Sequence, residues 1–256
     1  MKDPHYHAGD YYPQEASSMV IGEIVKRLSI DSTSFCLDLC AAPGGKSINL
    51  LQALPSDSFL IAKEVIRSRV RVLIESLRKW GSYNVGIASI HPKEWINANE
   101  LFDLILVDAP CSGEGMFRKQ ESKAISEWSM DNVRFCAERQ KSIIDKITPC
   151  IKKGGYLIYS TCTYSEAENG DMIEKIVQLG LEPEALAWPS DHDFVSIGGY
   201  QNAFQAYPHK VRGEGLFFSV FRKPGRCDTV VRSSEKKEIW NPIPMRIPAG
   251  FFTDRE

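Results

Sequence analysis

Short apolar runs alternate with helix-like segments along most of the chain. Continuous apolar runs of strand length occupy residues 34–39, 59–63, 84–88, 102–107, 156–160 and 217–221. Apolar residues recur at helical spacing between them, in residues 46–54, 67–80, 131–152 and 168–179, and a short helix is expected from residue 92. Strands of continuous apolar character that are separated by helices are typical of buried parallel strands. The pattern therefore predicts an α/β fold built on a doubly wound sheet.

The two ends of the chain extend this pattern differently. Residues 14–28 follow Pro13 and carry apolar residues at helical spacing, which predicts an amphipathic helix. Residues 217–221 are expected to form a final strand, antiparallel in a hairpin with a segment near Phe194. After Pro224 the sequence becomes charged and proline-rich, as in a linker or docking arm. We therefore expect a helical lead-in over residues 1–30, one main domain over residues 31–224 and a linker or C-terminal arm over residues 225–256.

The composition is that of an ordinary globular protein. The chain has 256 residues, of which 43% are hydrophobic and 25% charged, so it can bury one substantial core. No apolar run approaches the roughly eighteen residues of a membrane span, and the first residues do not resemble a signal peptide. We expect a cytoplasmic protein with no membrane partner. We also expect a monomer, because no apolar surface stripe stands out.

Cysteine content and charge exclude some classes of site. The seven cysteines are odd in number and scattered, which argues against a disulfide framework. There is no Cys-x-x-Cys pair, and His5 and His7 are interpreted as part of a polar terminus, so we predict no metal. The net charge of −2 does not by itself indicate nucleic-acid binding. That charge is a weak guide, however, because RNA responds to the local field near a cleft.

The turn after the first predicted strand, residues 37–47, is rich in small residues. Such a turn at the carboxyl end of a strand lets a ligand approach the backbone and the next helix's free amides. A P-loop requires glycine five positions before Gly45, where this chain has Cys40, and the Gly-x-Gly-x-x-Gly fingerprint is absent. The turn therefore suits a nucleoside-type ligand better than a triphosphate. Glu64, at the end of the second strand, is placed to bind a ribose such as that of adenosylmethionine, and the alternative is a solvated acid that begins a helix.

Two further loops each contain a cysteine. Cys111 follows the fourth strand within residues 108–119, and Cys162 follows the fifth within residues 159–165. Both loops are expected at the sheet edge that also carries the first turn. If the two strands are neighbours, the two thiols lie close together.

A pair of thiols in this place suits methylation of cytosine at carbon 5. Addition of a thiolate to carbon 6 makes carbon 5 nucleophilic enough to attack a methyl sulfonium. Asp108 is placed to stabilise the adduct near N3 and the amino group, and the second cysteine is placed to help the later loss of the carbon-5 proton and of the thiolate. The alternative, a buried cysteine that packs as a small hydrophobic residue, we assign to Cys36, Cys136 and Cys150.

These segments resemble the Sun-type (Nop/Sun, or Fmu) RNA cytosine-5 methyltransferases, and within them the RsmF/YebU branch. The resemblance runs from about Tyr11 to Arg222. It is carried by residues 14–19, 40–46, 108–119, 160–164, 168–169 and 208–215. It implies a class I methyltransferase (Rossmann-like) fold, with a mostly parallel seven-stranded sheet and helices on both faces. It also implies S-adenosylmethionine as cofactor and RNA as substrate, with ribosomal RNA favoured and tRNA as the alternative.

The resemblance assigns roles to the matched residues. Cys162, in the Thr-Cys-Thr loop, is the nucleophile, and Cys111 assists release of the methylated product. Lys46 orients Asp108, which lies between cofactor and base. The implied cofactor contacts are Cys40, Ala41, Ala42, Pro43, Gly44, Gly45, Lys46, Glu64, Arg69, His91, Asp108 and Pro110. The implied RNA phosphate contacts are Arg118, Lys119, His209, Lys210 and Arg212, for which solvated surface charge is the alternative.

Two features depart from the family pattern. The family usually has an aspartate after the third strand that contacts the adenine end of the cofactor, and His91 takes that place here. Members of this branch are also longer, with an extra amino-terminal domain and a carboxy-terminal RNA-binding domain. We therefore expect residues 225–256 to lead to an RNA-binding domain that this chain does not contain, which would explain its slightly negative charge.

Three other functions remain open from the sequence. In a DNA cytosine-5 methyltransferase, Cys111 would be the nucleophile and Cys162 dispensable. A catalytically weak methyltransferase fold that serves as an RNA-binding or assembly module would not need S-adenosylmethionine. A small-molecule methyltransferase would leave the paired cysteines without a purpose.

Overall fold

Strands and helices alternate along the chain, as the apolar pattern predicts. A computed structural model describes residues 3–89, 98–118, 125–126, 128–188 and 193–226. The strands are β1 (Phe35–Asp38), β2 (Phe59–Lys63), β3 (Val85–Ala88), β4 (Phe102–Asp108), β5 (Ile151–Thr161), β6 (Glu182–Pro183), β7 (Val195–Ser196), β8 (Ala203–Ala206) and β9 (Leu216–Arg222). The α-helices are α1 (Pro4–Ala8), α2 (Val20–Arg27), α3 (Gly45–Ala53), α4 (Arg67–Trp80), α6 (Met130–Ile147) and α7 (Gly170–Gln178). Short 3-10 helices occur at Ser17–Met19, Glu114–Met116, Thr148–Cys150 and Glu166–Glu168.

One sheet contains all of these strands. Their order is β3-β2-β1-β4-β5-β9-β8-β7, and β6 pairs with one end of β9. Strands β1 to β5 are parallel, whereas β9 is antiparallel to β5 and to β8. Seven of the described strands have four or more residues, and β6 and β7 have two each. The predicted doubly wound class I fold is confirmed, and the strand order reverses between β1 and β4, where such sheets bind ligands.

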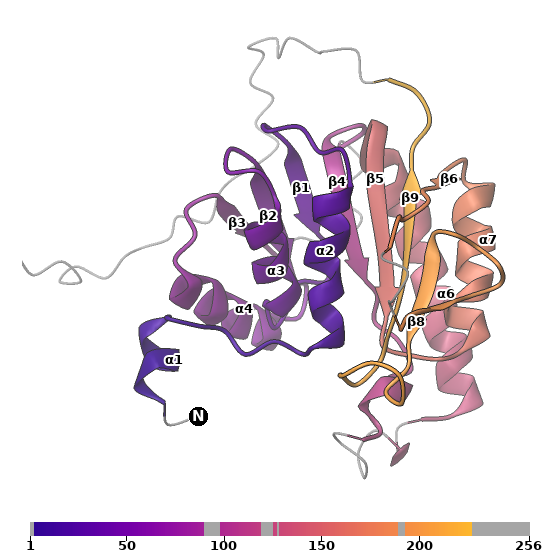
Figure 1. Ribbon diagram of the computed structural model, residues 1–256, viewed down its shortest axis with the longest axis horizontal. Helices are drawn as coiled ribbons and strands as arrows, with labels where there is room; N and C mark the ends of the chain where they lie inside the picture. The colour runs from indigo at the N-terminus through magenta and orange to yellow at the C-terminus, as the bar shows by residue number, and fades with distance from the viewer. Residues whose placement is uncertain (1–2, 90–97, 119–124, 127, 189–192, 227–256) are drawn as a thin grey trace, which may run out of the picture.

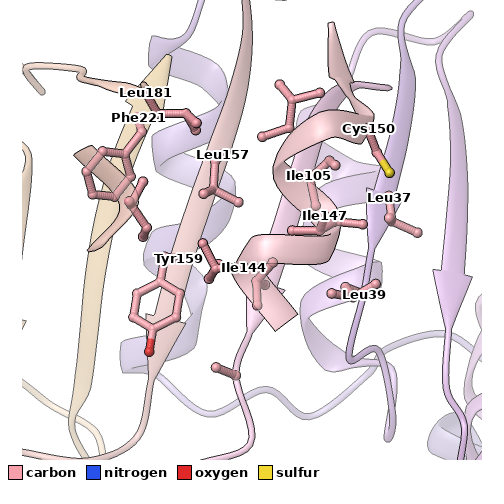
Figure 2. Close-up of a cluster of buried hydrophobic side chains, with 14 of the residues drawn as sticks. Leu37, Leu39, Ile105, Ile144, Ile147, Cys150, Leu157, Tyr159, Leu181 and Phe221 are labelled. Atoms are coloured by element: carbon pink, nitrogen blue, oxygen red, sulfur yellow. The ribbon is translucent and has the colours of Figure 1, made fainter. Parts of the chain in front are cut away.

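Helices cover both faces of the sheet (Figure 1). On one face, Leu157 and Tyr159 of β5 pack in a cluster with Ile144 of α6 (Figure 2). On the other face, Ile158 packs with Ile21 of α2. Because neighbouring residues of a strand point to opposite faces and both faces are buried, the strands show continuous apolar runs and no alternation.

The helix α6 ends earlier than its apolar pattern suggests. It stops at Ile147, and β5 begins at Ile151 instead of near residue 156. Pro149 is the reason, because proline has no N–H to continue the helical hydrogen bonds, and the chain makes a 3-10 turn over Thr148–Cys150 instead. Ile151 then pairs with Phe102 across an irregularity in the β4–β5 register.

The antiparallel end of the sheet differs from the predicted hairpin. The segment next to Phe194 forms β7, which pairs with β8, and β8 lies between β7 and β9. The expected direct pairing of residues 217–221 with the segment near Phe194 is therefore wrong. All four residues of β8 are buried, but the run was too short to be recognised as a strand.

The predicted amino-terminal helix is part of the core. It begins as a 3-10 turn at Ser17 and continues as α2, whose residues Val20, Ile21 and Ile24 are buried. The backbone N–H of Gly22 donates a hydrogen bond to the side chain of Asn49 in α3. A Cβ atom at position 22 would collide with that side chain, so glycine permits the close approach of the two helices. Within the ranges described, no helix combines the length and apolar character needed to cross a lipid bilayer.

Candidate active site

A cleft of about 350 Å³ opens at the carboxyl ends of β1, β4 and β5. Its lining includes residues 40–43, 45 and 46 of the turn after β1, together with Asp108 and Cys162. The structure therefore brings together three segments that were predicted separately. Other predicted residues, namely Gly44, Glu64, Arg69, Pro110 and Cys111, are not among those that line the cleft.

The turn after β1 is held against the neighbouring strand and helix. The backbone N–H of Ala41 donates to the carbonyl of Lys63 at 2.9 Å. Gly44 caps α3 with a φ of 115°, and a Cβ atom there would lie 3.0 Å from Cβ of Ser76 in α4. Glycine is therefore needed at this position for both its backbone conformation and its close contact.

Arg69 connects Glu64 with the same turn. Its Nη2 donates to the carbonyl of Ala42 at 2.6 Å, and its Nη1 lies 3.3 Å from Oε2 of Glu64. Glu64 is buried, and its Oε1 accepts the backbone N–H of Ile66 at 2.9 Å. Its Oε2 is buried without a hydrogen bond in the described structure, despite the nearby arginine. The predicted role of Arg69 as a direct cofactor contact stays a prediction, and the structure gives it a supporting contact with Glu64.

Lys46 and Asp108 form an ion pair inside the cleft. Nζ of Lys46 lies 2.9 Å from Oδ2 of Asp108, and the Ser160 hydroxyl donates to Oδ1 at 2.9 Å. Burial alone would lower the pKa of Lys46, but the charge of Asp108 and its hydrogen bond outweigh that effect and raise the pKa. The lysine is therefore held as a cation, and the carboxylate is oriented from two sides.

The two loop cysteines are in contact. Sγ of Cys111 and Sγ of Cys162 are 3.0 Å apart, and both residues are free thiols. The hydrogen bond from Cys111 lowers the pKa of Cys162, and Lys46 contributes in the same direction. The same hydrogen bond, with burial, raises the pKa of Cys111 well above its ordinary value. The contact between the two sulfurs therefore favours ionisation of Cys162 and keeps the proton on Cys111.

The remaining described cysteines have the opposite character to Cys162. Burial raises the pKa of Cys36, Cys40, Cys136 and Cys150, to about 12 for Cys40 and about 11 for Cys150. Cys36, Cys136 and Cys150 are buried. The buried environment of Cys36, Cys136 and Cys150 agrees with the packing role expected for them.

A glutamate fastens the two cysteine loops to each other. Oε2 of Glu114 accepts hydrogen bonds from the backbone N–H of Tyr164 at 2.8 Å and the hydroxyl of Thr163 at 3.0 Å. Its Oε1 accepts Nε1–H of Trp128 at 2.9 Å. In the same region, the backbone N–H of Gly115 donates to the carbonyl of Cys162 at 2.7 Å. These bonds fix the position of the Cys162 loop relative to the Cys111 loop.

A second glutamate, Glu168, binds the backbone of the Cys111 loop from the protein interior. Glu168 is fully buried, and its Oε2 accepts the backbone N–H of Ser112 at 3.0 Å and Nε2–H of Gln140 at 2.7 Å. Gln140 also donates to the carbonyl of Pro110 at 3.0 Å. Pro110, which was predicted to contact the cofactor, therefore takes part in this network through its backbone carbonyl.

The outer wall of the cleft comes from two segments far apart in sequence. Oε1 of Glu15 accepts the backbone N–H of Glu214 at 2.8 Å, and its other oxygen accepts the backbone N–H of Ser18 at 2.8 Å. Both Glu15 and Glu214 line the cleft. The wall was not predicted as part of the site.

Most of the predicted RNA contacts lie outside the cleft. Arg118, His209, Lys210 and Arg212 line a separate surface depression of about 410 Å³. Arg118 is not a free cation, because its Nε lies 3.2 Å from Oε2 of Glu214 and its Nη2 donates to the carbonyl of Gly213 at 2.9 Å. His91 and Lys119 lie outside the described residues. Across the described part of the chain, no group of three or more His, Cys, Asp or Glu side chains is arranged to hold a metal ion.

Sequence reasoning missed Glu15, Glu114 and Gln140. Glu15 and Glu114 lie within segments that carried the family resemblance, so their position in those segments was the available signal. Gln140 lies in the middle of α6 among residues of ordinary helical character, and no local signal distinguishes it.

Comparison with known proteins identifies the family. The family model described as "16S rRNA methyltransferase RsmB/F" matches residues 25–222. The relatives include "Ribosomal RNA small subunit methyltransferase F" of Aeromonas salmonicida (strain A449), 32% identical over 225 residues, which cover 84% of this chain and 46% of the relative. The protein of the same name from Serratia proteamaculans (strain 568) is 31% identical over 235 residues, covering 90% of this chain and 48% of the relative. The chain thus spans about half the length of the curated relatives it matches.

Solved structures agree with this comparison. The crystal structure of NSun6 from Pyrococcus horikoshii with SFG, an S-adenosylmethionine analogue, is 26% identical with a TM-score of 0.75, covering 88% of this chain and 56% of that one. A methyltransferase homolog protein from Pyrococcus horikoshii is 28% identical with a TM-score of 0.70, covering 86% of this chain and 70% of that one. The resemblance predicted from the motifs is confirmed. The chain belongs to the 16S rRNA methyltransferase RsmB/F family.

Proposed function

We propose that this chain is the catalytic domain of an S-adenosylmethionine-dependent RNA (cytosine-5) methyltransferase. One observation carries the proposal. Two free thiols lie 3.0 Å apart beside the Lys46–Asp108 ion pair, and the sulfur with the lowered pKa faces the cleft. A base that enters this cleft meets a nucleophile and a carboxylate, and the second thiol lies in contact with that nucleophile.

The residues around the turn after β1 fit S-adenosylmethionine. Ala41, Ala42 and Pro43 provide a small apolar surface beside the backbone. Glu64 has a buried carboxylate oxygen without a hydrogen bond, which suits a ribose hydroxyl donor. The solved relative with SFG supports the same class of ligand. When bound, this cofactor supplies the methyl group on a positively charged sulfur.

The side chains divide the chemistry among them. The thiolate of Cys162 adds to carbon 6 of cytosine, N3 takes up a proton, and carbon 5 becomes the nucleophile that receives the methyl group. Asp108, fixed by Lys46 and Ser160, accepts hydrogen bonds from the protonated N3 and the amino group. Water then takes the carbon-5 proton, the carbon 5–carbon 6 double bond forms again, and the carbon–sulfur bond breaks to return the thiolate. N3 returns to solvent the proton that it took up. Cys111 lies beside that bond and assists this last step.

The names of the relatives support ribosomal RNA as the substrate, with tRNA as the alternative. The exposed His209, Lys210 and Arg212 near the cleft supply part of the RNA contact. Residues 31–224 form the catalytic unit in this proposal, and residues 225–256 lead toward a further RNA-binding domain. Location in the cytoplasm and a monomeric state stay predictions from the sequence.

The two cysteines provide the decisive experiment. Cys111→Ala protein, incubated with total RNA and S-adenosylmethionine, should accumulate a protein–RNA adduct that survives denaturation, because the adduct forms but is released slowly. Cys162→Ala protein should form no adduct and transfer no labelled methyl group. Sequencing of the RNA methylated by the wild-type protein identifies the substrate.

The outcomes separate the alternative functions. Methyl transfer by Cys162→Ala protein would favour the chemistry of a DNA cytosine-5 methyltransferase and reverse the two cysteine roles. A folded wild-type protein that does not bind S-adenosylmethionine in calorimetric titration would favour an RNA-binding or assembly module.

A further inference from the structure

Three aromatic rings lead from the nucleophile loop to the surface. Tyr164 lies two residues after Cys162, and its ring stacks on that of Tyr207 with centroids 5.7 Å apart and an interplanar angle of 17°. The ring of His209 continues the row, with its centroid 5.5 Å from that of Tyr207 and a tilt of 33°. Tyr164 and Tyr207 are partly buried, whereas His209 is exposed. The row therefore ends in an aromatic ring that is open to solvent.

The side chain of Tyr164 and the backbone of Tyr207 are both fixed by hydrogen bonds. The hydroxyl of Tyr164 donates to the carbonyl of Glu214 at 3.0 Å. The carbonyl of Tyr207 accepts the backbone N–H groups of Lys210 and Val211, both at 2.9 Å. A preorganised platform of this kind loses little conformational entropy when a planar ligand packs on it.

The outer ring belongs to the depression that adjoins the cleft. Gly213 lines the depression and Glu214 lines the cleft, so one step along the backbone separates the two hollows. Arg118 fixes this boundary through its bonds to both residues. Lys210 and Arg212 are exposed in the depression, and neither forms an ion pair with any residue in the described ranges. The depression therefore offers an aromatic face and two available cations next to the cleft.

We propose that this depression holds the nucleotide adjacent to the target cytosine, with its base stacked on His209 and its phosphate near Lys210 and Arg212. The proposal rests on the proposed function and defines part of its RNA site. A cytosine that enters the cleft leaves its neighbour without a stacking partner, at an energetic cost to the RNA. Proteins commonly restore that stacking with an aromatic side chain, histidine included, when they bind single-stranded RNA. The site accepts any base at this position, because every base has a stacking face, and His209 acts through its ring and not as a phosphate contact.

A fluorescent base distinguishes stacking from charge. The probes are two single-stranded oligoribonucleotides with one cytosine each, carrying 2-aminopurine immediately before or immediately after it. They are titrated with wild-type protein and S-adenosylhomocysteine. We expect quenching on binding for one of the two probes. His209→Ala should abolish that quenching and weaken binding by about five- to a hundredfold, the usual range for a lost stacking partner.

Matched variants test the alternative explanations. His209→Phe keeps the ring and should retain both quenching and affinity. Lys210→Ala should weaken binding most at low salt while quenching in the bound complex persists. Replacement of the flanking base by an abasic site should remove the difference between wild-type and His209→Ala proteins.

Several results would overturn the stacking site. Equal losses for His209→Phe and His209→Ala would show that the imidazole acts through its nitrogens. Unchanged quenching with His209→Ala, or no quenching of either probe in a bound wild-type complex, would exclude the site while leaving the methyltransferase proposal intact. Failure of the wild-type protein to bind the probes, together with failure of Cys111→Ala protein to form an adduct with RNA, would contradict the proposed function itself.

Discussion

Two thiols with similar positions in their loops acquire opposite properties from their surroundings. A hydrogen bond joins the two sulfurs and lowers the pKa of Cys162, and the charge of Lys46 acts in the same direction, so negative charge is favoured on Cys162. Burial and the neighbouring thiolate keep the proton on Cys111. At the scale of single residues, the difference between the two thiols is therefore an electrostatic consequence of their mutual contact and of the Lys46 charge, which acts on Cys162.

Alkylation should report this difference directly. Because the thiolate is the reactive form, Cys162 should react with iodoacetamide at lower pH than the other described cysteines. Cys111→Ala removes the donor that lowers the pKa of Cys162, so the alkylation profile of Cys162 should move to higher pH. Peptide mass spectrometry across a pH series measures both effects. Earlier labelling of Cys111 than of Cys162 in the wild-type protein would contradict the assignment.

Asp38 gives a separate pH effect on stability. Burial raises the pKa of this carboxyl, which accepts a hydrogen bond from Ser47, to about 7. The folded protein then keeps a proton that the unfolded chain releases above about pH 4, so the contribution of Asp38 to stability falls between about pH 4 and about pH 7.

In Asp38→Asn this fall is absent. The free energy of unfolding of the variant, relative to wild type, should therefore rise by about 1–3 kcal/mol between about pH 5 and pH 8. Urea denaturation at the two pH values measures the change. Asp131→Asn, which removes the charge of an exposed side chain, controls for net charge. A constant difference between Asp38→Asn and wild type would show that Asp38 is not the source.

At the scale of elements, the site depends on how two loops are joined. Glu114 accepts three hydrogen bonds, two of them from Thr163 and Tyr164 of the Cys162 loop. Glu114→Ala leaves these donors without their acceptor and should lower the free energy of unfolding by about 1–3 kcal/mol. It should also alter the alkylation rate of Cys162, because the loop that positions this sulfur is released.

Glu138→Ala is the matched control, since it removes a carboxylate that is 73% exposed and pairs with Lys141 on the surface of α6. We expect its effect on unfolding to stay within about 0.5 kcal/mol. Equal effects of the two substitutions on stability and on alkylation would mean that the Glu114 bonds do not organise the loop.

Local signals predicted the elements, and contacts between distant residues escaped them. The turn after β1 could be predicted because close packing there requires Gly44 and small residues around it, and these follow one another in the sequence. By contrast, Glu114 binds Tyr164 50 residues away, and Glu15 binds Glu214 199 residues away. Arg118 resembled a free cation for the same reason, because its partner Glu214 lies far along the chain. The partner of β9 was misassigned because antiparallel neighbours are selected by the whole sheet.

At the scale of the whole molecule, segments near the two ends of the described chain lie together and form one wall of the cleft. Glu15 joins the segment before α2 to the segment before β9, and both line the cavity. The pKa of Glu15 lies below its ordinary value, because hydrogen bonds from Ser17, Ser18 and Glu214 outweigh the effect of burial. The carboxylate therefore remains ionised and holds the wall at neutral pH.

Removal of this link should weaken cofactor binding. In Glu15→Ala the two segments separate more easily, and we expect the Kd for S-adenosylmethionine to rise on the order of tenfold, equivalent to about 1.4 kcal/mol. Isothermal titration calorimetry measures the change. Glu23→Ala, which removes an exposed carboxylate of α2 that pairs with Lys26, is the control. Equal affinities for S-adenosylmethionine in Glu15→Ala and wild type would show that the wall does not need this link.

The place of β9 in the sheet has a consequence for synthesis on the ribosome. This strand comes last among those described, yet it lies between β5 and β8. Until residue 222 has left the exit tunnel, β9 cannot pair with β5, so the edge of β5 is unpaired. For the same reason β8 cannot join the sheet formed by β1 to β5. An unpaired apolar edge readily recruits strands from other chains. Nascent chains that stall before Leu216 are therefore the species most in need of chaperones. Once β9 has emerged, it covers the edge of β5 and aggregation through that edge stops.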